Sequence, residues 1–144
     1  MAINITRKEY RDSCKNHYIA YSKLSDEEKY RKSGRLLLFY AVECGLKCYI
    51  MKNENLSDYN ALQKYAINTG KKEIARHNVK AMLIDCNLEG RYILKDIPLS
   101  KGGKVSSDEF NQVWRYGASV ADEEIGNKNE KVLRQIMEYL LKRI

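Results

Sequence analysis

The sequence is poor in the residues that interrupt helices. Proline occurs once in 144 residues and glycine eight times, a composition that favours helices over a fold built on many tight turns. Charged side chains interrupt its most apolar stretch, residues 30–52, so this stretch is too polar to span a membrane. The four cysteines follow no secretory signal and lack the spacing of a disulfide scaffold. We therefore expect an all-α cytoplasmic protein with free thiols and without contact to a membrane.

Motifs for the commoner catalytic chemistries are also missing. The sequence has no Gly-rich phosphate loop, no HExxH motif and no CxxC pair. Only His17 and His77 could exchange protons near neutral pH. A metal site would require two expected helices to bring together four residues that match no zinc motif: Cys14, His17, Cys44 and Cys48. We expect small buried thiols instead, with no metal and no cofactor.

The sequence does carry a clear excess of positive charge. There are 26 Lys and Arg against 19 Asp and Glu, which gives a net charge of +7. Such a balance fits an anionic partner, for example nucleic acid, a nucleotide or an acidic protein surface, although many soluble domains are equally basic. The length of 144 residues and the hydrophobic content of 44% are typical of one folded domain.

The stretch 30–52 predicts the central helix of that domain. Its apolar or small residues recur at alternating steps of four and three, as on one face of a helix: Tyr30, Gly34, Leu37, Ala41, Cys44, Cys48 and Met51. A capping box formed by Ser25 and Glu28 places the helix start near residue 27, so that the helix covers about residues 27–52. We expect Leu37, Ala41, Cys44 and Cys48 to be nearly fully buried. Glu43 and Lys47, one turn apart, should form an ion pair.

The remaining segments complete an up-and-down bundle of five or six helices in a single domain. Capping signals, apolar periodicity and glycines predict a helix from Thr6, then the central helix, then a short helix after Ser57 that ends at Gly70. A helix in 71–88 with Asn78 as an internal cap and a loop over 90–106 follow. Last come a helix from Ser106 or Ser107, with Phe110, Val113, Trp114 and Tyr116 inward, and a helix over 127–144.

Three short motifs resemble those of the HEPN family of helical domains. They are Ala41-x-Glu43-x-x-Leu46-Lys47, His77-Asn78-Val79 and Trp114-Arg115-Tyr116. The resemblance covers most of the chain and implies one compact bundle of about four or five helices. It also implies a link to RNA, because many HEPN proteins are ribonucleases with an Arg-x4-6-His motif late in the fold. There the arginine would hold the scissile phosphate and the histidine would move a proton.

The sequence departs from this catalytic motif. No histidine follows His77, so neither Arg115 nor Arg134 has a partner at the required spacing. One formal match, from Arg11 to His17, lies in the first helix instead of late in the fold. These two residues are six positions apart, or about 240° around a helix, so they would not face one another within one chain. A homodimer could still bring them together from two subunits.

HEPN-like proteins recur in bacterial toxin–antitoxin and other conflict systems, and a domain without the catalytic pair is suited to binding. We therefore expect a non-enzymatic antitoxin or immunity-type protein that binds and blocks a toxin, for example a nuclease. One alternative is a HEPN ribonuclease that uses Arg11 and His17. The other is a nucleotide- or RNA-binding module in which Arg76, His77 and Lys80 hold a phosphate at a helix start. For His77 itself, we favour a hydrogen bond to the backbone that fixes the loop between two helices.

Overall fold

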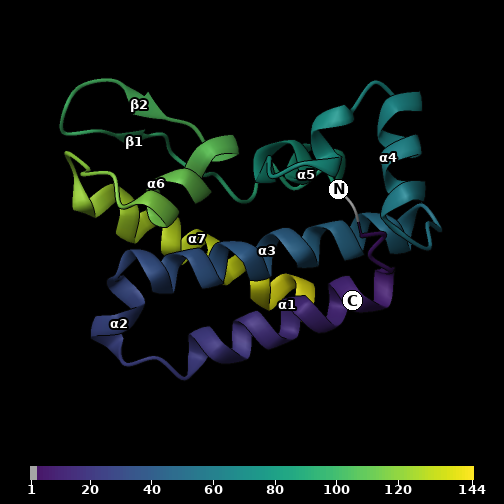
Figure 1. Ribbon diagram of the computed structural model, residues 1–144, viewed down its shortest axis with the longest axis horizontal. Helices are drawn as coiled ribbons and strands as arrows, with labels where there is room; N and C mark the ends of the chain where they lie inside the picture. The colour runs from purple at the N-terminus through teal and green to yellow at the C-terminus, as the bar shows by residue number, and fades with distance from the viewer. Residues whose placement is uncertain (1–2) are drawn as a thin grey trace.

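The frame of the fold is one long helix with the other helices packed along it. The computed structural model describes residues 3–144. These residues form seven α-helices, two 3-10 helices and two strands: α1 (Arg7–Ser22), α2 (Asp26–Tyr30), α3 (Lys32–Asn53), α4 (Tyr59–Asn68), η1 (Lys72–Ala75), α5 (Val79–Asp85), β1 (Ile97–Pro98), β2 (Lys104–Val105), η2 (Ser107–Glu109), α6 (Phe110–Tyr116) and α7 (Glu123–Leu141). In Figure 1, α3 crosses the middle of the molecule between α1 and the group formed by α4, α5 and α6, and α7 packs against it from behind. The predicted all-α helical bundle is confirmed.

The central helix begins later than predicted. The Ser25–Glu28 capping box is present, but it begins the separate short helix α2. Arg31 then takes an extended conformation with ψ of 157°, and α3 starts at Lys32 instead of near residue 27. The chain folds back tightly here, because a Cβ atom on Gly34 would lie 2.5 Å from the carbonyl oxygen of Glu28. Glycine at position 34 therefore permits α2 to pack directly on the first turn of α3.

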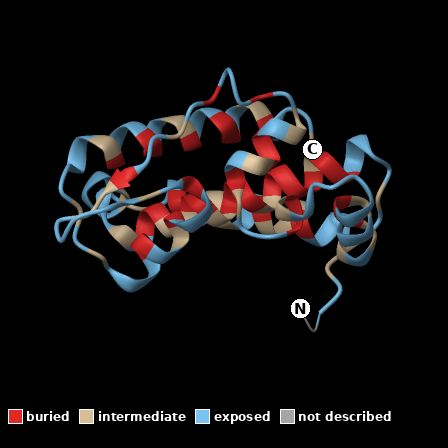
Figure 2. Cartoon of the chain, turned by 90° about the horizontal axis from the view of Figure 1, so that it is seen from above, coloured by how far each residue is buried: buried red, intermediate tan, exposed pale blue. Residues whose placement is uncertain are grey.

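Burial extends around most of α3 instead of following one stripe. Figure 2 shows the buried residues gathered where the helices face one another. Ala41 and Cys48 are buried as expected, whereas Leu37 and Cys44 are only half-buried, so the prediction was wrong for these two. The fully covered side chains include Leu38 and Leu46. The reason is that α1, α5, α6 and α7 cover α3 from several directions, which also buries three of its charged residues: Arg35, Glu43 and Lys47.

Local capping signals were reliable at several helix starts. Thr6 and Glu9 form the reciprocal capping box of α1 that the sequence predicts. Asn78 caps α5, accepting the backbone N–H of Ala81 at 3.0 Å. The single helix expected over 71–88 is nevertheless divided into η1 and the seven-residue α5, because the chain turns away from helical geometry at Arg76 and His77.

Three other boundaries differ from the prediction. The cap of α4 is Asp58, not Ser57, and α7 starts at Glu123, four residues before the expected start. Within residues 90–106, predicted as a loop, β1 and β2 form a small antiparallel hairpin around Gly102 and Gly103, both of which have positive φ.

The inward-facing residues of the last two helices were mostly identified. Phe110, Val113 and Trp114 are buried as expected, whereas Tyr116 is exposed. Four apolar residues of α7 that the periodicity selects are buried: Leu133, Ile136, Met137 and Leu140. Among the described residues, no helix combines the length and apolarity that a membrane span requires.

Candidate functional site

The first pair of candidate residues does not meet within the chain. Arg11 lies 3.8 Å from the carboxylate of Asp12 and lines a pocket next to the end of α3. The ring of His17 instead faces Tyr40, with ring centroids 6.1 Å apart. Six residues of helix also separate Arg11 from His17 by about 9 Å along the axis. The arrangement of one chain therefore offers no joint site for these two side chains.

The second group of candidates lies on the turn between η1 and α5. Arg76 is exposed and pairs with Glu73 at 3.4 Å, and Lys80 is exposed on the first turn of α5. His77 points to the central helix, where its Nδ1 atom lies 2.5 Å from Oε1 of Glu43. Glu43 is thus paired with His77. The prediction of an ion pair between Glu43 and Lys47 was wrong, because no such pair forms among the described residues. The hydrogen bond holds the turn against α3, but its partner is the Glu43 carboxylate and not the backbone group that the sequence predicted.

The Glu43–His77 pair favours the cationic form of an exposed imidazole. The Glu43 side chain is 8% exposed and the His77 side chain is 60% exposed. The hydrogen bond to Glu43 raises the pKa of His77, against the opposing effects of partial burial and of the nearby cations of Lys47 and Arg115. Because Nδ1 is engaged by Glu43, Nε2 is the ring atom that remains for a ligand.

Two polar groups under this pair have no partner of their own. Lys47 is buried, and within residues 3–144 its ammonium makes no hydrogen bond or ion pair; it lies 5.8 Å from the centre of the Tyr10 ring. Burial lowers the pKa of Lys47 and raises the pKa of Tyr10. The buried hydroxyl of Tyr10 also lacks a hydrogen-bond partner in the part of the chain described. Of the two groups, the Tyr10 hydroxyl is the fully buried one without a partner in the described chain, and such a group costs about 1–3 kcal/mol.

The three segments that carry the HEPN resemblance lie on α3 and at α5 and α6, which both pack against α3. Glu43 comes from α3, His77 from the turn before α5, and Arg115 from the last turn of α6, close enough to influence the pKa of His77. The sequence order of these residues does not predict this arrangement, because Arg115 follows His77 by 38 positions and no Arg-x4-6-His spacing results. The sequence predicted Lys47, not His77, as the partner of Glu43. A carboxylate within an apolar helical stretch was the available signal, because a buried charge needs a partner.

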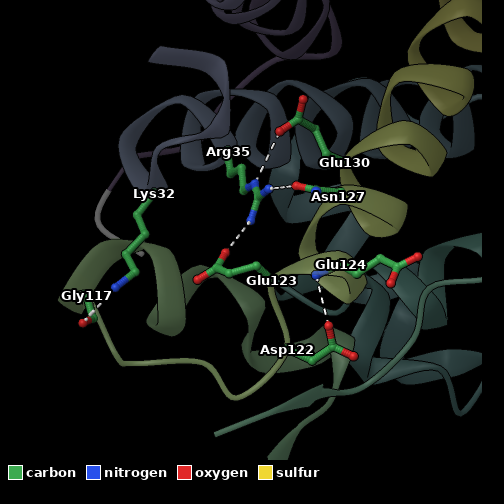
Figure 3. Close-up of polar contacts among 8 residues, drawn as sticks. All are labelled: Lys32, Arg35, Gly117, Asp122, Glu123, Glu124, Asn127 and Glu130. Carbon is green, nitrogen blue, oxygen red and sulfur yellow. Dashed lines mark hydrogen bonds and ion pairs between the residues drawn. The ribbon is translucent and has the colours of Figure 1, made fainter. Parts of the chain in front are cut away.

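A second buried charge centre, which was not predicted from the sequence, joins the start of α3 to α7 (Figure 3). Arg35 donates to Glu130 at 3.2 Å and to Asn127 at 2.6 Å. The other carboxylate oxygen of Glu130 accepts the Tyr21 hydroxyl at 2.8 Å. Gly126 makes room for the guanidinium, because a Cβ atom there would lie 2.3 Å from Nη1 of Arg35. Each ionised group is matched, so this centre is a structural connection between α1, α3 and α7.

The cysteines do not form a metal centre in the described part of the chain. Cys14 contacts the sulfur of Met137 at 3.9 Å, and Cys44 contacts the hydroxyl of Ser13 at 3.6 Å. All four cysteines are free thiols. No group of three or more histidine, cysteine or acidic side chains between residues 3 and 144 is placed to hold a metal ion.

Comparison with protein-family models, with curated proteins and with solved structures finds no match to this chain. We therefore infer its function from the arrangement of Glu43, His77, Lys47 and Arg115.

Proposed function

We propose that the protein binds a phosphate-bearing ligand, a nucleotide or an RNA strand, at the surface around His77. The observation that carries this proposal is the exposed imidazole of His77, held by a hydrogen bond to the buried carboxylate of Glu43, which raises the pKa of His77 and so favours its cationic form. Arg115 adds a second positive charge nearby, and Arg76 and Lys80 belong to the same turn. Positive groups fixed in place bind phosphate better than mobile ones because less conformational entropy is lost.

The start of α5 contributes little to this site, whereas the sequence predicted a phosphate held at this helix start. The helix has only seven residues, and the Asn78 side chain already accepts the backbone N–H of Ala81. Binding would therefore rest on the side chains of His77 and Arg115. The net charge of +7 supports the same ligand class, because it attracts polyanions at long range.

A second candidate function is cleavage of the bound RNA. It is favoured by one observation: Glu43 occupies Nδ1 of His77 and so fixes the ring, with Nε2 left as the proton-transfer atom. Arg115 would then hold the phosphate, in place of the pair Arg11 and His17 that the sequence suggested. This candidate requires the same residues as the binding function, so one set of variants tests both.

The test is fluorescence anisotropy with a labelled single-stranded RNA and a labelled adenine nucleotide, at two salt concentrations. We expect His77→Gln and Arg115→Gln each to weaken binding. The control Lys128→Gln removes one positive charge from α7, where Lys128 pairs only with Glu124, and should have little effect. Equal affinity of the His77 variant and wild type would refute the proposal. Incubating each protein with RNA and separating the products by electrophoresis decides whether binding leads to cleavage.

The antitoxin or immunity-type function predicts a different result. In that case RNA and nucleotide would not bind, and in cells that express a toxin from a neighbouring gene, both the wild type and His77→Gln would restore growth. Protection that persists without His77, together with no anisotropy change, would replace the phosphate-binding function by a protein-binding one.

A further inference from the structure

At the end of α7, two arginines from distant parts of the chain surround one tyrosine. Cζ of Arg143 lies 3.6 Å from the ring centre of Tyr139, and Cζ of Arg91 lies 5.3 Å from the same point. Arg143 also donates to the carbonyl oxygen of Tyr139 at 2.8 Å. The ring is held in turn by Tyr49, whose hydroxyl is 3.1 Å from that of Tyr139. Both guanidinium groups are therefore positioned by cation–π contacts instead of by carboxylates.

The charge of this cluster is not balanced by the protein. Arg91, Lys142 and Arg143 are exposed, and none of them forms an ion pair within residues 3–144. They line a pocket of about 440 Å³ that contains one carboxylate, Glu138. Holding three cations close to one carboxylate costs electrostatic free energy, which an anion bound in the pocket would offset.

A second basic pocket, at the end of α3, is connected to the first by a hydrogen bond. Lys52 donates to the carbonyl oxygen of Arg143 at 2.7 Å, and Lys52 also lines this second pocket of about 490 Å³. Three more cations line it, and none of its lining residues has an acidic side chain: Arg7, Lys8 and Arg11. Asp12, just outside, pairs with Lys8 at 2.7 Å and Arg11 at 3.8 Å, whereas Arg7 has no ion pair in the described chain. The two linings, taken together as one surface connected by this hydrogen bond, carry seven basic side chains against one acidic side chain, Glu138.

We propose that this surface, which we call the C-terminal basic surface, binds phosphate groups: Arg91, Lys142 and Arg143 in the first pocket, with Arg7, Arg11 and Lys52 in the second. It shares no residue with the His77 site and does not depend on the function proposed there. Guanidinium groups fixed on an aromatic ring offer paired N–H donors that match phosphate oxygens. Two connected pockets suit successive phosphates of a single-stranded nucleic acid, and a small phosphorylated compound would need only the first.

The experiment measures binding of a labelled single-stranded oligonucleotide of about 12 nucleotides, with inorganic pyrophosphate as competitor. The double variant Arg91→Gln/Arg143→Gln should weaken binding at least about tenfold and lower the slope of log Kd against log salt by about 2. The matched control Lys128→Gln/Lys131→Gln removes the same charge from exposed positions earlier in α7 and should change both quantities much less. Thermal unfolding of each variant, followed by circular dichroism, confirms that the chain is folded.

Two further variants separate the possible results. Arg7→Gln/Arg11→Gln should weaken binding of the oligonucleotide and leave competition by pyrophosphate unchanged, if the ligand is a nucleic acid. Pyrophosphate displacement that depends on Arg91 and Arg143, with no effect of Arg7 or Arg11, would identify a small phosphorylated ligand instead. His77→Gln should leave the effect of Arg91→Gln/Arg143→Gln intact. Equal losses in the Arg91/Arg143 variant and in the Lys128/Lys131 control would overturn the proposal.

Discussion

Replacement of Gly126 by alanine tests the buried charge centre, because local and tertiary effects have opposite signs. In a helix, alanine is favoured over glycine by about 1 kcal/mol at most, so Gly126→Ala in α7 would ordinarily stabilise the protein. Here the new Cβ would lie 2.3 Å from Nη1 of Arg35 and 3.1 Å from its Cζ. The guanidinium would have to move away from Asn127 and Glu130, which it contacts at 2.6 Å and 3.2 Å.

The tertiary effect should dominate. A hydrogen bond to a charged group contributes about 1.5–3 kcal/mol, and crowding of a packed interior typically costs about 1–3 kcal/mol. After subtraction of the gain in helix propensity, we expect Gly126→Ala to lower the free energy of unfolding by about 1–3 kcal/mol. Urea unfolding followed by far-UV circular dichroism measures this change directly.

A second background makes the prediction specific to Arg35. When Arg35→Ala removes the guanidinium, Gly126→Ala should become neutral or stabilising, by up to about 1 kcal/mol. Gly90→Ala serves as a steric control, because a Cβ atom there would have nothing within 4 Å. The reasoning would be refuted if Gly126→Ala stabilised the protein in the wild-type background, or if its effect were the same with and without Arg35.

Other changes test the core, the His77 pair and the cysteines. Leu46→Ala, at a fully buried position, should cost about 2–5 kcal/mol in urea unfolding, and Leu37→Ala, at a half-buried one, clearly less. Because the folded pKa of His77 is raised, its pairing with Glu43 stabilises the protein fully below the unfolded pKa and is lost as pH rises through the folded pKa. The difference in stability between wild type and His77→Gln should therefore shrink from weakly acidic to alkaline pH, and a constant difference would contradict the pairing. Burial raises the pKa of Cys14 and Cys86 to about 12, so native protein at neutral pH should react slowly with a thiol reagent, and EDTA should leave its melting temperature unchanged.

Features set by neighbouring residues could be predicted from the sequence. The capping boxes at Thr6 and Ser25 and the cap at Asn78 are all present, because each requires only residues within one helical turn. The break of the central helix at Arg31 was not predicted, since it depends on the backbone contact between Gly34 and α2. The β1–β2 hairpin was missed for a similar reason. It has two residues per strand, and its edge is supported by a bridge from Leu99 to the distant Val120.

The candidate site was predictable in its parts and not in its assembly. The sequence singled out His77 and Arg115 as motif residues, but the partner of His77 lies 34 positions away on α3. The i,i+4 rule favoured Lys47 as the partner of Glu43 because it considers one helix alone. In the fold, the Lys47 ammonium lies near the Tyr10 ring of α1, and Glu43 is reached from the other side by the turn before α5. Contacts between helices decided the pairing.

The difference between the two buried charge centres is the reason for placing function at His77. Around Arg35, the carboxylate of Glu130 meets the guanidinium groups of Arg35 and Arg134, Glu123 also pairs with Arg35, and the Tyr21 hydroxyl completes the network, so nothing further is needed for stability. Around Glu43, the carboxylate is paired with His77, the cations of Lys47 and Arg115 lie close enough to affect the pKa of His77, and the Tyr10 hydroxyl has no partner in the described chain. A purely structural pair would require only Glu43 and His77. The additional cations raise the electrostatic free energy of the unliganded protein, and a bound anion is the simplest group that would lower it.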